Sequence, residues 1–154
     1  TLEDLFAGRP INIEQVMEQL IRTAGELGLP FGKREKTFNS RLAQELGKFA
    51  EQQQKGEAFH NAAFRAYFAD GLNIGLPATL VEIGASIGLN AATVEEVLEK
   101  RLFKDTVDKD WTRSHQMSVT AVPTFMMNGM SLVGAQPYEK LAQMVEVQGV
   151  AKRF

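Results

Sequence analysis

The 154-residue sequence contains no cysteine, so the chain has no disulfide bond, thiolate nucleophile or cysteine metal ligand of its own. Its two histidines, His60 and His115, are fewer than most histidine metal sites use, and we expect neither a metal ion nor another cofactor. No apolar run approaches about 18 residues, which predicts that no segment spans a membrane. The N-terminus has no basic region followed by an apolar one, so no signal peptide is visible.

Strong charge of either sign is also missing. Seventeen Lys and Arg residues stand against 19 Asp and Glu residues, which gives a formal net charge of −2. This balance argues against a nucleic acid or an anionic membrane as partner, because both require clustered basic residues. The length is that of one ordinary domain. Residue 1 is Thr1 rather than Met, and we therefore expect the chain to be a piece of a longer protein.

The first hundred residues have the apolar spacing of successive helices. Asn12 followed by Gln15 is typical of a capping box, and the apolar positions from Ile13 to Leu27 share one helical face. Gly28 marks the end of this helix. The same spacing predicts five further helices. The first is capped by Thr37, the second runs from about Glu57 to Asp70, and the third has Pro77 in its first turn. The fourth is capped by Asn90, and the fifth runs from about Asp105 to Met117. The 57–70 helix has a broad apolar face that includes Phe64 and Phe68, which predicts packing on more than one side.

The pattern changes after residue 118. Val119–Met127 and Met130–Val133 are apolar and partly β-branched, and Asn128-Gly129 between them is a strong hairpin signal. A final helix follows Pro137. The sequence thus predicts a mainly α fold of the α+β class, in which a helical block precedes a β-hairpin and a helix. A two-stranded hairpin is barely stable alone, and no other segment here supplies a strand.

One motif suggests a hydrolase. Gly84–Gly88 reads G-x-S-x-G, the pattern of a nucleophile elbow, and acidic residues and His115 follow in the hydrolase order (Asp105, Asp108 and Asp110). An elbow must lie between a strand and a helix. The helical spacing of Leu80, Ile83 and Ile87 runs through this motif instead, so we interpret its small residues as helix packing.

Other reactive side chains have simpler structural explanations. We interpret His60 and His115 as ordinary surface or core histidines rather than ligands or catalysts. Met126, Met127 and Met130 surround the hairpin turn, and core packing or surface exposure near the turn explains them better than a metal site does.

The segment Thr120–Phe125 is more informative. Pro123 lacks an N–H and begins an otherwise apolar strand, which places it at the first residue of a strand or at a sheet edge. From these residues alone, a cis and a trans Val122–Pro123 peptide are equally compatible with the sequence.

The order of the C-terminal motifs resembles a known family. Val-Pro-Thr-Phe at 122–125, Asn-Gly at 128–129 and Gly-Ala-Gln-Pro at 134–137 resemble the C-terminal half of the DsbA-family thioredoxin-like oxidoreductases, FrnE-like branch. The segments 64–68, 73–75 and 88–92 look like parts of that family's helical insertion. The resemblance implies a helical domain over 1–104 and the C-terminal part of an incomplete thioredoxin-like domain over 105–154.

The resemblance also implies a site. The Val122–Pro123 peptide would be cis and face the active site, with Val122 offering its backbone to an extended substrate strand. Gly134, Ala135 and Gln136 would form an anion site, for example for a glutathione carboxylate. The family's Cys-x-x-Cys motif would lie before Thr1, so no catalytic residue is expected in this chain. Ala121 stands where family members often have Gly.

Three functions remain open. The first is a thiol–disulfide oxidoreductase, acting on protein or small-molecule thiols and disulfides and inactive as this chain alone. The second is a glutathione-dependent isomerase or kappa-class glutathione transferase relative, which uses a Ser-based motif. The third is a non-catalytic helical interaction module. The residues encoded before Thr1 would distinguish them, and a cytoplasmic location follows from the resemblance alone.

The family's first strand would lie beside the strand that follows Pro123. Without that strand, the backbone groups of Thr124–Met127 form an open edge, which is a template for another chain. We therefore expect a homo-oligomer formed through this edge.

Overall fold

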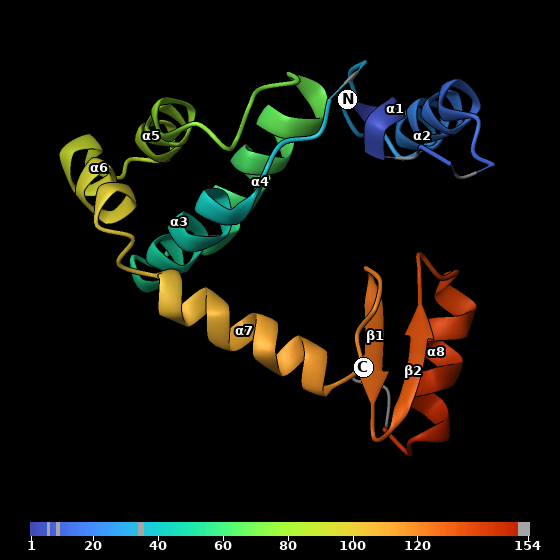
Figure 1. The fold of residues 1–154 in the computed structure, drawn as a ribbon. Helices are drawn as coiled ribbons and strands as arrows, with labels where there is room; N and C mark the ends of the chain where they lie inside the picture. The colour runs from blue at the N-terminus through green and yellow to red at the C-terminus, as the bar shows by residue number, and fades with distance from the viewer. Residues whose placement is uncertain (6, 9, 34–35, 151–154) are drawn as a thin grey trace. The chain divides into compact units, whose positions relative to one another are not determined.

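The computed structural model describes residues 1–5, 7–8, 10–33 and 36–150 (Figure 1). These residues form a mainly α structure with one two-stranded antiparallel sheet, as the sequence predicted. The chain divides into two compact units, Thr1–Asp108 and Lys109–Phe154. The division falls inside helix α7 (Lys104–Gln116). The helical domain predicted from the sequence ended at residue 104, which is the first residue of this helix. None of the described helices is long and apolar enough to cross a membrane.

The first unit is built from helices. Those that precede α7 are α1 (Leu2–Leu5), α2 (Ile13–Glu26), α3 (Arg41–Gln52), α4 (Gly56–Phe64), the π-helix η1 (Arg65–Ala69), α5 (Pro77–Ser86) and α6 (Ala91–Glu99).

Helix α3 lies at the centre of the helical core. It packs against α4, α5 and α6, and its residues Leu46 and Ala50 are completely buried. Phe59 of α4, Leu80 of α5 and Val94 of α6 complete the most deeply buried part of this core. The apolar faces predicted for α4, α5 and α6 therefore meet around α3. The predicted apolar face of α2 does not join this core, since Val16 and Leu20 are each 42% exposed.

Local end signals are confirmed for several helices. The Asn12 side chain accepts a hydrogen bond of 3.0 Å from the Gln15 N–H, and Asn90 caps α6 in the same way. Pro77 is the first residue of α5. Gly84 and Ser86 lie within this helix, so the G-x-S-x-G motif is not a strand-to-helix elbow.

The predicted cap at Thr37 is wrong. Helix α3 begins at Arg41, because the Asn39 side chain accepts a 2.9 Å hydrogen bond from the Arg41 N–H and forms a local turn there. Phe38 stands before the helix, and its ring lies 6.4 Å from that of Tyr67. An aromatic contact with a distant segment therefore replaces the helical turn that the spacing suggested.

The predicted helix over 57–70 also differs in detail. It is α-helical only to Phe64 and continues as a π-helix over Arg65–Ala69. The Gly32 N–H donates a 2.8 Å hydrogen bond to the Phe68 carbonyl, so a loop from elsewhere in the chain bonds to the π-helical backbone. The predicted packing on more than one side is wrong for Phe64, which is 61% exposed.

Among the described residues of the helical unit, one charged side chain is buried. Glu45 of α3 is 1% exposed, and its carboxylate accepts hydrogen bonds from Arg41 Nε at 2.8 Å and from Arg101 Nε and Nη2 at 2.7 and 2.6 Å. Arg41 also donates to the Lys104 carbonyl and to Asp108 at the start of α7. These bonds connect α3 to the link between α6 and α7.

The second unit contains a hairpin and a helix. Strands β1 (Thr124–Met127) and β2 (Met130–Val133) pair with Thr124 opposite Val133 and Met127 opposite Met130. Asn128 and Gly129 form the turn with φ values of 45° and 81°, as predicted. Helix α8 (Tyr138–Val147) follows, and its Met144 is buried.

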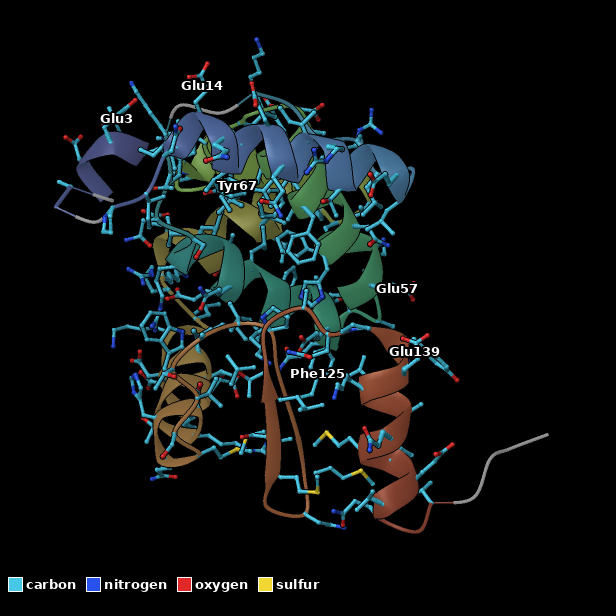
Figure 2. All side chains as sticks on the ribbon, turned by 90° about the vertical axis from the view of Figure 1, so that its right-hand side faces the viewer. Glu3, Glu14, Glu57, Tyr67, Phe125 and Glu139 are labelled. Atoms are coloured by element: carbon cyan, nitrogen blue, oxygen red, sulfur yellow. The ribbon has the colours of Figure 1, made fainter. Side chains whose placement is uncertain are left out.

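One face of the hairpin is directed toward α8. The pairing places Phe125, Met127, Met130 and Leu132 on the same face. Gln148, which follows α8, donates to Met130 Sδ, and Figure 2 shows Phe125 on the side of the hairpin next to α8. Met127 is half-buried, whereas Met126 and Met130 are 40% and 39% exposed, so this cluster combines packing with exposure near the turn.

The first prediction concerns Gly32. A Cβ atom at this position would lie 2.2 Å from the Ala69 carbonyl oxygen, which is backbone and has little freedom to move. We expect Gly32→Ala to lower the free energy of unfolding by about 2–3 kcal/mol, measured by urea denaturation. Gly25→Ala in α2 is the control, because nothing lies within 4 Å of its Cβ and Ala favours helix by about 0.5–1 kcal/mol. Equal stability of both variants would contradict the close approach of the loop to η1.

The second prediction concerns Glu45. Hydrogen bonds from Arg101 and then Arg41 hold the pKa of Glu45 below its usual range despite the burial of the carboxylate. A lowered folded-state pKa stabilises the fold above the unfolded-state value, and this contribution is lost as the pH falls below about 4.

We expect Glu45→Gln to lower the free energy of unfolding by about 3 kcal/mol at pH 7. This is the low end of the range for a broken buried ion pair, because Arg101 is partly exposed. The variant's stability should also depend less on acid than the wild type's. Glu96→Gln, which removes an exposed pair with Lys100, should leave the denaturation midpoint nearly unchanged. Parallel pH profiles for wild type and Glu45→Gln would contradict this assignment.

Candidate functional site

The loop before β1 carries the predicted site residues Val122 and Pro123. The peptide bond between them is cis, the geometry expected from the sequence resemblance. The Thr124 hydroxyl donates a 2.6 Å hydrogen bond to the Ala121 carbonyl across the loop. The Gly134 N–H donates a 2.7 Å bond to the Pro123 carbonyl. The loop is thus attached to its own strand and to the end of β2.

Val122 in this loop is 86% exposed. Within the part of the chain that the structure describes, neither its backbone N–H nor its C=O makes a hydrogen bond. An exposed residue with both backbone groups unused can pair with an extended segment of another molecule. The arrangement therefore provides one position for strand-like binding.

The segment Gly134–Gln136 lies directly beside this loop. Gly134 has φ of 86°, and its N–H is the group that bonds to Pro123. The Gln136 side chain is directed toward the end of β2, where its Nε2 donates a 2.7 Å hydrogen bond to the Val133 carbonyl. Glu139 lies in the first turn of α8, where its negative charge opposes a bound anion. The glutathione site at Gly134, Ala135 and Gln136 stays a prediction.

The hairpin is what brings the two predicted segments together. Thr124 pairs with Val133, so residues 121–123 and 134–136 emerge at the same end of the sheet although eleven or more positions separate them. His60 of α4 and His115 of α7 belong to different units. Among the described residues, no group of three or more His, Asp or Glu side chains is placed to hold a metal ion.

The sequence reading missed one surface feature of the helical unit. His60, Phe64 and Phe68 are spaced by four residues, and their rings follow one another along α4 and η1. The spacing itself was visible in the sequence. It was interpreted as a wide buried face, since apolar periodicity alone does not separate a core face from an exposed one.

Comparison with known proteins identifies the family. The family model described as "DSBA-like thioredoxin domain" matches residues 3–146, which is nearly the whole chain. The chain belongs to this family.

Two solved structures show the same fold. The "probable DsbA oxidoreductase SCO1869 from Streptomyces coelicolor" is 27% identical, with a TM-score of 0.85 over 99% of this chain and 69% of that one. A 2-hydroxychromene-2-carboxylate isomerase is 19% identical, with a TM-score of 0.70 over 89% of this chain and 66% of that one, and this likeness concerns the fold alone.

A curated relative is similar in sequence. The uncharacterized protein YwbO of Bacillus subtilis (strain 168) is 30% identical over 95 residues, which are 61% of this chain and 48% of the relative. The matched region thus spans about half the length of that relative.

Proposed function

We propose that this chain supplies the substrate-binding loop and the helical domain of a DsbA-family thiol–disulfide oxidoreductase of the FrnE-like branch. The observation that carries the proposal is Val122, which is exposed beside Pro123 with both backbone groups unbonded within the described residues. Family membership over residues 3–146 and the likeness to a probable DsbA oxidoreductase support it.

In this proposal, Val122 holds an extended segment of the substrate by backbone hydrogen bonds. The chain has no cysteine, so the redox pair of such an enzyme comes from a part of the protein outside these 154 residues. A thiolate of that pair attacks one sulfur of the substrate disulfide, forming a mixed disulfide and releasing the other sulfur as a thiolate. The second cysteine of the pair then displaces the substrate, leaving the enzyme oxidised and the substrate reduced.

A glutathione-dependent isomerase is the alternative, because the scaffold of the 2-hydroxychromene-2-carboxylate isomerase is similar. Such an enzyme would use the same loop and the segment Gly134–Gln136 for glutathione. A non-catalytic helical module would use neither the Val122–Pro123 loop nor the segment Gly134–Gln136.

The third prediction tests Val122 in the protein expressed together with the residues that its gene encodes before Thr1. Val122→Pro removes the backbone N–H, and we expect it to lower kcat/KM for insulin disulfide reduction about tenfold or more, the effect of one lost hydrogen bond. Val122→Ala keeps the N–H and should stay within about threefold of wild type. The 154-residue chain alone should be inactive, since it has no thiolate.

Three results would contradict the oxidoreductase proposal. The first is equal activity of Val122→Pro and wild type. The second is insulin reduction by the cysteine-free chain. The third is a longer protein without a Cys-x-x-Cys motif, where a Ser at that position would favour the isomerase and no thioredoxin-like strand would favour the module.

We also propose that a second copy of this chain covers the open edge of β1. No charged residue occurs from Met117 to Tyr138, so the edge lacks the charges that normally prevent strand pairing. Phe125 and Met126 on this strand are 37% and 40% exposed.

The fourth prediction concerns this edge. We expect the 154-residue chain to sediment as a dimer or larger species and Met126→Lys to shift it to monomer, because a lysine on an edge strand opposes pairing. Met117→Lys is the matched control, since Met117 is also 40% exposed but lies outside both strands. A wild-type monomer at all concentrations would contradict the proposal.

A further inference from the structure

The tip of the hairpin carries the one Asn-Gly pair of the sequence, Asn128-Gly129. Both residues are exposed, and a Cβ atom at Gly129 would have nothing within 4 Å of it. The Gly129 N–H makes no hydrogen bond within the described residues. The backbone nitrogen that follows Asn128 is therefore unbonded and accessible to water, and glycine has no side chain that would obstruct a reaction there.

An asparagine side chain beside such a nitrogen can lose ammonia. A base takes the proton of the Gly129 N–H, and the nitrogen attacks Cγ of Asn128. The new N–Cγ bond closes a succinimide ring, the Cγ–Nδ2 bond breaks, and Nδ2 takes a proton from solvent and leaves as ammonia. Water then opens the ring at either carbonyl carbon, which leaves aspartate or isoaspartate at position 128. The reaction consumes water and requires no oxidant, reductant or other co-reactant.

The leaving group of this reaction is held in the folded protein. Asn128 Nδ2 donates a 2.9 Å hydrogen bond to Gln148 Oε1, and Gln148 Nε2 donates to Met130 Sδ at 2.9 Å. Gln148 directly follows α8, and Figures 1 and 2 show that this helix ends near the hairpin turn. Ring closure moves Cγ toward the backbone and expels Nδ2, so the bond from Asn128 to Gln148 must break along the way.

Deamidation removes the donor from this connection. A carboxylate at position 128 only accepts hydrogen bonds, as Met130 Sδ does, so Gln148 Oε1 loses its partner. The new negative charge also lies beside the C-terminal end of α8, where the helix dipole is itself negative. No charged residue occurs from Met117 to Tyr138, so no cation of this segment offsets the charge. Both effects weaken the attachment of α8 to the hairpin turn.

We propose that Asn128 is a modification site, at which loss of ammonia releases the end of α8 from the hairpin turn, and that Gln148 determines how fast this happens. Water alone does not restore the amide, so the hairpin changes once, from an uncharged form tied to α8 into a charged and released form. This inference goes beyond the proposed function and does not depend on it, because the reaction uses only residues of this chain and water.

The fifth prediction is tested by mass spectrometry on the 154-residue chain, incubated in mildly alkaline buffer and then digested with trypsin. The peptide that contains Asn128 is separated into its asparagine, aspartate and isoaspartate forms. We expect Gln148→Ala to deamidate at Asn128 about fivefold faster than wild type, the effect of one lost hydrogen bond. Gln148→Glu is the matched control, because its carboxylate still accepts from Asn128 Nδ2, and its rate should stay within about twofold of wild type.

Asn39 provides an internal control in the same digests. It precedes Ser40 rather than a glycine, and its side chain accepts a hydrogen bond from the Arg41 N–H. Its deamidation should be slower than that of Asn128 and equal in all three proteins. In concentrated urea, wild type and Gln148→Ala should react at Asn128 at the same rate, and faster than folded wild type, because unfolding removes the bond to Gln148.

The structural consequence is measured in Asn128→Asp, which carries the charge of the product. We expect the NMR signals of the Gln148 side-chain amide to shift toward those of a free glutamine side chain. The thermal midpoint should fall by about 2–4 °C, the shift for one lost contact in a chain of this length. Asn61→Asp, which adds the same charge to helix α4 in the other unit, should leave the Gln148 signals unchanged.

Three results would overturn the inference. Equal rates at Asn128 and Asn39 in every protein would refute the modification site. Equal rates at Asn128 in wild type and Gln148→Ala, or equal acceleration in Gln148→Ala and Gln148→Glu, would refute the role of Gln148. Unchanged Gln148 signals in Asn128→Asp would refute the release of α8. None of these measurements involves disulfide reduction, so their outcome is separate from that of the proposed function.

Discussion

Backbone N–H and C=O groups that leave water must find hydrogen-bond partners, and this constraint determines the structure at its least regular points. In the helical unit, the Phe68 carbonyl is bonded by the Gly32 N–H from a separate loop. In the hairpin unit, the Pro123 carbonyl is bonded by the Gly134 N–H. The first bond holds the π-helical segment in place, and the second holds the loop that carries Val122, the proposed binding position.

The same constraint explains where binding is expected. Val122 has both backbone groups unbonded within the described residues, and the outer edge of β1 has no strand beside it there. Groups of this kind are satisfied by water in the free protein and by a partner strand in a complex. Both features of the hairpin unit are unpaired backbone, the kind of group that an extended polypeptide can bond to.

Features with a local cause could be read from the sequence. Asn12, Pro77 and Asn90 begin helices through bonds or dihedral angles within one turn, and Asn128-Gly129 makes a hairpin through its own φ values. Such signals require no knowledge of what lies across the fold. The Val122–Pro123 loop was assigned to the site through the family resemblance and not through a local signal.

Features caused by distant contacts could not be read in this way. The cap at Thr37 failed because Phe38 contacts Tyr67 instead of continuing a helix. The spacing of apolar residues does not reveal the π-helix Arg65–Ala69. Its backbone accepts a hydrogen bond from Gly32, which is distant in the sequence. The burial of Glu45 likewise depends on Arg101, 56 positions away. The family resemblance supplied the site residues, but the exposure of Phe64 required the structure.

The central claim is that Val122 binds substrate through its backbone, and the most direct measurement is the NMR response of its amide to an extended cystine-containing peptide. A peptide strand bonded at Val122 should move this amide proton downfield in a saturable way and slow its exchange with solvent. The Gly129 amide in the hairpin turn should not respond. An unchanged Val122 signal at peptide saturation, or equal shifts at Val122 and Gly129, would contradict the account.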